Sequence, residues 1–141
     1  MTHQIEWLIP DHLLNVIISG EISGDDIIRI TDDSIEAIEH SAAPLVHSIL
    51  QVSGVTKLPT LAEIAQVMKE IKPRPRSGWT IMVMTANPIV RWAADFTMQL
   101  SGVRYRRADN MGDALRQMRH LVEALDWSQL PEEYRTLQQS E

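Results

Sequence analysis

The sequence predicts a single α/β domain with one five-stranded, mixed and mostly parallel sheet and about four helices. Near the N-terminus, two apolar, β-branched segments joined by the turn Pro10-Asp11-His12 predict an antiparallel hairpin. Along the rest of the chain, short apolar segments alternate with segments of helical spacing, as in sheets whose parallel strands are joined by crossover helices. A chain of 141 residues with 44% hydrophobic side chains suffices for one core. The predicted order is therefore β-β-α-β-α-β-α-β-α.

The predicted strands differ in how deeply they should be buried. Ile5, Trp7 and Ile9 alternate with other residues and predict a half-buried first strand. Four further strands are predicted at residues 13–19, 45–52, 79–85 and 103–107. The fourth strand is almost wholly apolar, which is typical of a strand covered on both faces, and the last is short and charged, which suits a sheet edge. The last four should run parallel, with the first strand antiparallel at one side.

Each predicted helix begins after a side chain that can cap it: Ser23, Thr60, Asn87 and Asn110. Thr60 and Glu63 have the spacing of a capping box, and Gly102 is placed to end the third helix. Apolar residues at helical spacing should face the core, namely Ile28, Thr31, Ile35, Ile38 and Ala42 in the first helix, Leu61, Ile64, Ala65, Met68 and Ile71 in the second, Val90, Ala93, Thr97 and Leu100 in the third, and Leu115, Met118, Val122 and Leu125 in the fourth. Trp79 and Trp92 are expected to anchor the core, and Trp7 or Trp127 to be partly exposed.

Composition excludes several function classes. The chain has no cysteine, so it has no disulfide, thiol nucleophile or Cys-based zinc site, and its histidines lack zinc-ligand spacing. A net charge of −6 disfavours nonspecific nucleic-acid binding. We find no signal-peptide pattern and no membrane span, and therefore expect a cytoplasmic protein. Residues 1–125 should form the domain, and residues 126–141 a C-terminal extension that is either a docked helix or a loose tail.

Four short sequence motifs lie at predicted strand ends or helix beginnings: Ile18-Ser19-Gly20-Glu21-Ile22-Ser23, Val52-Ser53-Gly54-Val55-Thr56, Asn87-Pro88-Ile89-Val90-Arg91 and residues 108–115. In this order they resemble the STAS domain, which is best known from bacterial anti-sigma-factor antagonists. The resemblance covers about Ile5 to Leu125. It implies the α/β fold predicted above and a non-catalytic regulatory module. Its partner would be a protein such as an anti-sigma-factor-like kinase or another regulator.

The resemblance also singles out the beginning of the second helix. Regulatory STAS proteins carry Asp-Ser-Ser-Gly there, with the first serine as the kinase target, whereas this chain has Pro59-Thr60-Leu61-Ala62. Thr60 is therefore the equivalent of the phosphoacceptor, but its polar neighbours are replaced. Because Thr60 is also a predicted helix cap, we expect a cap without a switch. The implied partner-binding surface is Lys57, Leu58, Pro59, Thr60, Leu61 and Glu63.

Two further features leave alternatives open. A second function class is a carrier or sensor of a small apolar, lipid-like ligand, whose pocket would be lined by Trp79 or Trp92 and by six methionines, although adaptable packing is their commoner role: Met68, Met82, Met84, Met98, Met111 and Met118. Lys72, Arg74 and Arg76 surround two prolines in a predicted surface loop, which would bind an acidic partner or an anionic membrane surface without being needed for folding. A homodimer is a further alternative. No nucleophile–base pair is found, so we expect no catalytic residue, no cofactor and no metal ion.

Overall fold

The computed structural model describes residues 1–71 and 75–139, which are built around a five-stranded sheet with the strand order β1-β2-β3-β4-β5. The strands are β1 (Thr2–Ile9), β2 (Leu13–Glu21), β3 (Val46–Lys57), β4 (Ser77–Val83) and β5 (Tyr105–Ala108). β1 pairs antiparallel with β2, and β2 to β5 run parallel. The predicted mixed, mostly parallel sheet is confirmed.

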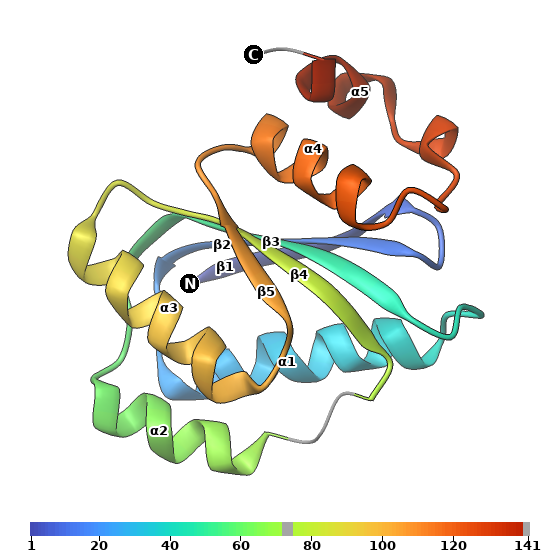
Figure 1. The fold of residues 1–141 in the computed structure, drawn as a ribbon. Coiled ribbons are helices and arrows are strands. Elements are labelled where there is room, and N and C mark those ends of the chain that lie inside the picture. The colour runs from blue at the N-terminus through green and yellow to red at the C-terminus, as the bar shows by residue number, and fades with distance from the viewer. Residues whose placement is uncertain (72–74, 140–141) are drawn as a thin grey trace.

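Helices cover both faces of this sheet (Figure 1). They are α1 (Gly24–Glu39), α2 (Leu61–Glu70), α3 (Pro88–Ser101), α4 (Met111–Leu121) and α5 (Glu132–Gln139), with the 3-10 helix η1 (Trp127–Gln129) before α5. Right-handed crossovers between successive parallel strands place α1, α2 and α3 on the same face. α4 follows the last strand and covers the opposite face together with α5.

Each face of the sheet has its own hydrophobic core, because alternate residues of a strand point to opposite sides. Leu14 of β2 belongs to the core under α1, α2 and α3, together with Met82 of β4. Leu13 belongs to the core under α4, together with Ile81. The sheet is thus buried on both faces, which explains the nearly continuous apolar character of its central strands.

The predicted helix ends agree with the structure where the signal is local. Ser23 caps α1 in a reciprocal pair with Asp26, and Asn87 and Asn110 cap α3 and α4. Gly102 ends α3 in the left-handed region at φ 71°. Each of these interactions lies within a few residues along the chain, so the sequence alone indicates it.

The predicted buried faces of the helices need correction. In α1, Thr31 and Ile38 are buried as expected, and Ile30 is the third buried residue. Ala42, which was expected on the buried face, lies beyond the end of the helix and is exposed. In α3, Ala94 and Met98 are buried, whereas Leu100 is 44% exposed. In α2, Val67 joins Ile64 in the core. Periodicity indicates that a helix has an apolar face, but the neighbouring elements decide which residues at the margin of that face are covered.

The C-terminal segment is docked and contributes side chains to the second core. Trp127 is only 7% exposed and Leu130 1%. The Trp127 indole Nε1–H donates a hydrogen bond of 3.1 Å to the Val122 carbonyl. Of the two tryptophans for which partial exposure was considered, Trp7 is therefore the half-buried one. Among the described helices, none is both long and apolar enough to cross a membrane.

Candidate functional site

The carboxyl ends of β2, β3 and β4 and the beginnings of α1, α2 and α3 lie at one edge of the sheet (Figure 1). Binding sites of open α/β sheets commonly form at this edge. Ser23 and Asp26 close the beginning of α1, with the Asp26 backbone N–H donating to the Ser23 hydroxyl at 3.1 Å. The Ser23 backbone N–H donates to the Asp26 carboxylate, and this bond, followed by the one to the Ser23 side chain, lowers the pKa of Asp26.

Thr60 lies at this edge and caps α2. Its hydroxyl oxygen accepts a hydrogen bond of 3.2 Å from the Glu63 backbone N–H and donates to the Glu63 carboxylate at 3.3 Å. The predicted cap is confirmed, although the Glu63 carboxylate bonds to the Thr60 hydroxyl instead of completing the capping box. Thr60 is exposed. Its hydroxyl is therefore accessible while it also stabilises the first turn of the helix.

The other residues of the predicted partner surface differ in exposure. Lys57 and Glu63 are exposed, and Pro59 and Leu61 are half-buried. Leu58 packs against the core between the sheet and α1, α2 and α3. Leu58 therefore anchors this segment to the domain and is not an exposed part of the predicted partner surface.

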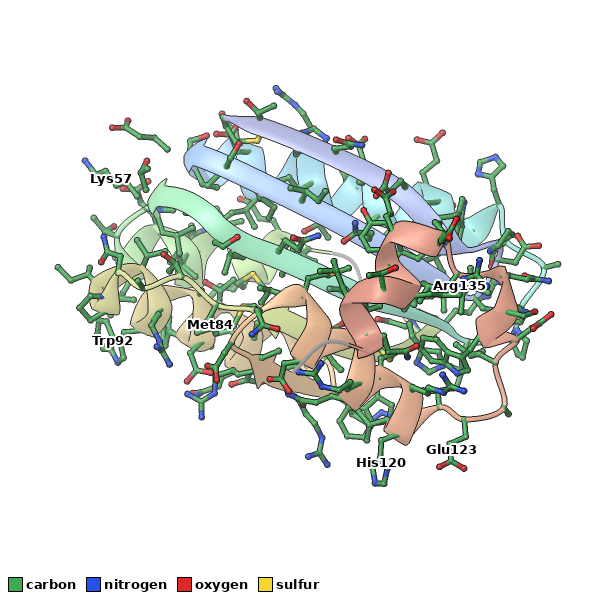
Figure 2. All side chains as sticks on the ribbon, turned by 90° about the horizontal axis from the view of Figure 1, so that it is seen from above. Lys57, Met84, Trp92, His120, Glu123 and Arg135 are labelled. Carbon is green, nitrogen blue, oxygen red and sulfur yellow. The ribbon has the colours of Figure 1, made fainter. Side chains whose placement is uncertain are left out.

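Two large apolar side chains of α3 are exposed at the same edge. Ile89 is 76% exposed and Trp92 61%, both in the first turns of the helix that Asn87 caps. Figure 2 shows Trp92 projecting away from the domain, at the same end of the molecule as Lys57. The expectation that Trp92 anchors the core was wrong. Periodicity contained the signal, since Val90, Ala93 and Ala94 face the core and Trp92 falls on the other side of the helix.

The predicted basic loop lies only partly within the described residues. Lys72 and Arg74 lie outside them. Arg76 is half-buried, and its guanidinium donates to the Ser41 carbonyl and hydroxyl, both at 2.9 Å, and to the Ala43 carbonyl. Arg76 is therefore not a free surface charge. It joins the segment before β4 to the segment between α1 and β3, and these bonds argue against the expectation that it is dispensable for folding.

A cavity of about 130 Å³ lies between the sheet and α1, α2 and α3. Of the six methionines named for the apolar-ligand alternative, Met68, Met82 and Met98 line it. Met84, Met111 and Met118 do not, and neither does Trp79 or Trp92. Trp79 packs against the core on the opposite face, where the guanidinium carbons of Arg104 and Arg106 lie 5.1 and 5.4 Å from its ring centre.

His47 of β3 is a buried residue whose ring has a hydrogen-bond partner. It is 6% exposed, and its Nδ1 accepts a hydrogen bond of 2.9 Å from the Trp79 backbone N–H. Burial, followed by the charges of Arg104 and His12, lowers its pKa. Within residues 1–71 and 75–139, no three His, Asp or Glu side chains are grouped so that they could hold a metal ion.

Comparison with known proteins gives a likeness in fold. No protein-family model matches the sequence, and no curated protein sequence matches it either. An uncharacterised protein of the DUF3478 family with a SpoIIAA-like fold, from Shewanella loihica PV-4, superposes with a TM-score of 0.56 at 15% identity, over 82% of this chain and 91% of that one. The anti-sigma factor antagonist SpoIIAA in its unphosphorylated form superposes with a TM-score of 0.53 at 16% identity, over 84% of this chain and 97% of that one. The chain therefore has the SpoIIAA-like, or STAS-like, fold that the resemblance implies.

Proposed function

We propose that this chain is a non-catalytic regulatory module that binds a partner protein at the carboxyl edge of its sheet. The contact surface consists of the exposed part of residues 57–63 and of Ile89 and Trp92 on α3. We call it the edge surface. The observation that carries the proposal is the exposure of Ile89 and Trp92, at 76% and 61%, at the edge of the sheet where α2 also begins.

An exposed tryptophan on a capped helix is well suited to protein recognition. Trp combines a large apolar area with few rotatable bonds, so ordering it at an interface costs little entropy, and it is enriched among residues that dominate binding energy. α3 is held by the Asn87 cap and by its buried Val90, Ala93 and Ala94, so Ile89 and Trp92 project from a rigid base. Their apolar surface would be removed from water on binding.

The neighbouring segment adds polar groups to the same surface. α2 packs beside α3, and Lys57 and Glu63 are exposed on either side of the Thr60 cap. An apolar centre flanked by charged side chains has the layout of a transient protein interface. The SpoIIAA structure supports a regulatory role, since that protein is an anti-sigma factor antagonist with the same fold.

The test places a photo-crosslinking amino acid at position 92 in the protein as it is made in its own host. The matched control carries the crosslinker at Leu45, which is 40% exposed and precedes β3 at the opposite edge of the sheet. We expect a discrete crosslinked partner from position 92 and none from position 45. The partner, identified by mass spectrometry, is then purified and titrated with the protein.

Binding variants complete the test. Ile89→Ser and Trp92→Ala should each weaken the affinity at least tenfold, because truncation of a central apolar anchor costs about 2 kcal/mol or more. Leu45→Ser removes a similar exposed apolar side chain and should leave the affinity unchanged. Equal crosslinking from both positions, or unchanged affinity in the α3 variants, would refute the edge surface. A chemical reaction catalysed by the purified chain would refute the non-catalytic assignment.

A further inference from the structure

The cavity under α1, α2 and α3 is apolar over most of its wall, yet it has hydroxyl groups on the strands that form its floor. Ser48 of β3 and Thr80 of β4 occupy paired positions on neighbouring parallel strands. Both line the cavity, as does Thr31 of α1 from the opposite wall. No acidic, basic or histidine side chain is among the lining residues. Ser34, Thr97 and Ser101 also line the cavity, but each of their hydroxyls donates to a backbone carbonyl of its own helix. The cavity thus has a mostly apolar wall, with the hydroxyls of Ser48, Ser77 and Thr80 on the strand side.

These hydroxyls are unusual for their position. Strands covered on both faces are normally apolar, and the corresponding positions two residues further along are Leu50 and Met82. Thr80 is 7% exposed and Thr31 8%. Within the described part of the chain, neither these two hydroxyls nor that of Ser48 takes part in a hydrogen bond. Among the described side chains, Gln138 Nε2 is the one polar atom that is both fully buried and unpaired, so these three hydroxyls keep accessible surface in the cavity that they line. A polar atom inside the cavity would therefore find hydrogen-bonding partners there.

We propose that the cavity binds a small neutral molecule with one ring and one hydroxyl group, of the size and polarity of phenol. Its hydroxyl bonds to Ser48 and Thr80, and its ring contacts the apolar wall. This site is independent of the edge surface and goes beyond the proposed protein-binding function.

The volume of the cavity and the absence of charged side chains in its lining favour this class of ligand. A dry protein cavity of about 150 Å³ accommodates benzene, and the cavity here is about 130 Å³. A carboxylate or phosphate inside it would lose its hydration without gaining a charged partner, which is strongly unfavourable. Met68, Met82 and Met98 add flexible thioethers to the wall, and sulfur makes favourable contacts with aromatic rings.

The test compares three probes that share one ring, namely phenol, benzene and benzoate. Titrations of the protein labelled with 13C at its methionine methyl groups are followed by NMR, and affinities are measured by calorimetry. We expect phenol to shift the signals of Met68, Met82 and Met98 and not that of Met111, which packs against the core on the other face. Phenol should bind about tenfold more tightly than benzene, since one hydrogen bond has about this effect. Benzoate should not bind.

Variants separate the polar floor from the apolar wall. The double variant Ser48→Ala/Thr80→Val removes both hydroxyls at nearly constant volume and should reduce phenol binding to that of benzene. Thr56→Val removes an exposed hydroxyl of β3 outside the cavity and should leave the preference for phenol unchanged. Ala94→Leu fills the cavity from α3 and should abolish binding of both probes. If Ala94→Leu does not fold, the double variant and its control decide the question.

Several results would overturn the proposal. These are equal affinity for phenol and benzene in the parent, binding of benzoate, an unchanged preference in the double variant, or no shift of Met68, Met82 and Met98 at saturating phenol. The last result would mean that the cavity holds only water.

Discussion

The Tyr134 hydroxyl in α5 donates a hydrogen bond of 2.9 Å to the Glu6 carboxylate in β1, across 128 positions of the sequence. The same carboxylate oxygen accepts a bond of 3.0 Å from the Asn15 amide, and the Asn15 carbonyl oxygen accepts one of 2.9 Å from Gln51. This network joins α5 to three strands of the sheet. Burial, followed by the bond to Glu6, raises the pKa of Tyr134 to about 12.

Replacing Tyr134 by Phe should lower the free energy of unfolding by about 1 kcal/mol at neutral pH. Hydrogen bonds to charged groups contribute about 1.5–3 kcal/mol, and the half-exposed position of Tyr134 reduces this. The free energy of unfolding of the variant should also change less at alkaline pH than that of the parent. A group whose pKa rises from 10.0 to about 12 on folding stabilises the protein fully below pH 10, and this contribution is lost as pH rises toward 12.

Urea unfolding at several pH values measures both effects. Tyr105 has a raised pKa for a similar reason but is present in both proteins, so the difference between parent and variant isolates Tyr134. The same stability and the same alkaline profile for both proteins would show that the Tyr134–Glu6 bond contributes nothing.

His47 should make the protein less stable in acid. Burial lowers its pKa from 6.5 in the folded state. The unfolded state therefore takes up a proton on the His47 ring at a higher pH than the folded state does. Its contribution to stability is fully present above pH 6.5 and is lost as pH falls below that value. His47→Asn keeps an acceptor near the Trp79 N–H without titrating in this range, so its stability should fall less steeply below pH 6.5. Thermal melts between pH 5 and 8 test this; parallel curves for parent and variant would contradict it.

The surroundings of His47 supply a second check on its position. A Cβ atom added at Gly78 would lie 2.3 Å from the His47 Nδ1 atom. We expect Gly78→Ala to be more destabilising than His47→Asn, because the ring is held by backbone on one side and by the core on the other.

Thr60→Ala should lower the free energy of unfolding by about 1 kcal/mol, because the Glu63 N–H loses its acceptor at the beginning of α2. Thr60→Ser is the matched control and should be nearly neutral, since serine caps at least as well. Thr60→Asp should also preserve stability, since aspartate caps well and suits the positive end of the helix dipole. Chemical denaturation measures all three. An Ala variant as stable as the parent would exclude the cap as a source of stability.

Analysis of the protein isolated from its own host distinguishes the two possible roles of Thr60, a helix cap and a phosphoacceptor. A phosphate on Thr60 would be tolerated at a helix N-terminus, so stability measurements alone do not detect a switch. We expect a cap without a switch, because Pro59 and Leu61 replace the polar neighbours of the phosphoacceptor in the resembling family. Intact-mass analysis that finds phosphate on Thr60 would overturn this expectation.

Arg76→Ala should lower the free energy of unfolding by about 2–3 kcal/mol. The Ser41 carbonyl and the Ala43 carbonyl would lose a charged donor, and both residues are buried, at 8% and 4% exposure. Arg76→Lys should recover part of the loss, and Arg91→Ala, at an exposed position of α3, should have little effect. Urea unfolding is the measurement, and an Arg76→Ala variant as stable as Arg91→Ala would restore the view of Arg76 as a dispensable surface charge.

The sequence predicted well those features that depend on residues close together along the chain. The Ser23 and Thr60 caps and the Gly102 helix end depend on residues within one helical turn, and all three were predicted correctly, although the predicted capping box of Thr60 and Glu63 is not completed. The sheet with its antiparallel first strand was also predictable, because short apolar segments and short connections permit few topologies.

Long-range contacts account for what the sequence left undetermined. In the sequence, the positively charged Arg76 looks like a solvated side chain. The pairing of β3 with β4 brings Ser41 and Ala43 beside it. In the sequence, Ser48 and Thr80 look like ordinary strand residues. The same pairing places them opposite each other on neighbouring strands, where both line one cavity.

By itself, therefore, the sequence determined the order of the elements, their caps and the existence of an apolar face on each helix, since these depend on neighbours along the chain. The tertiary structure alone decided that Leu100, on the predicted apolar face of α3, is exposed while Trp127 is buried. The physical reason is that burial is a property of what packs opposite a side chain. α3 has no element over its outer face among the described residues, whereas the segment of Trp127 closes over the core beneath α4.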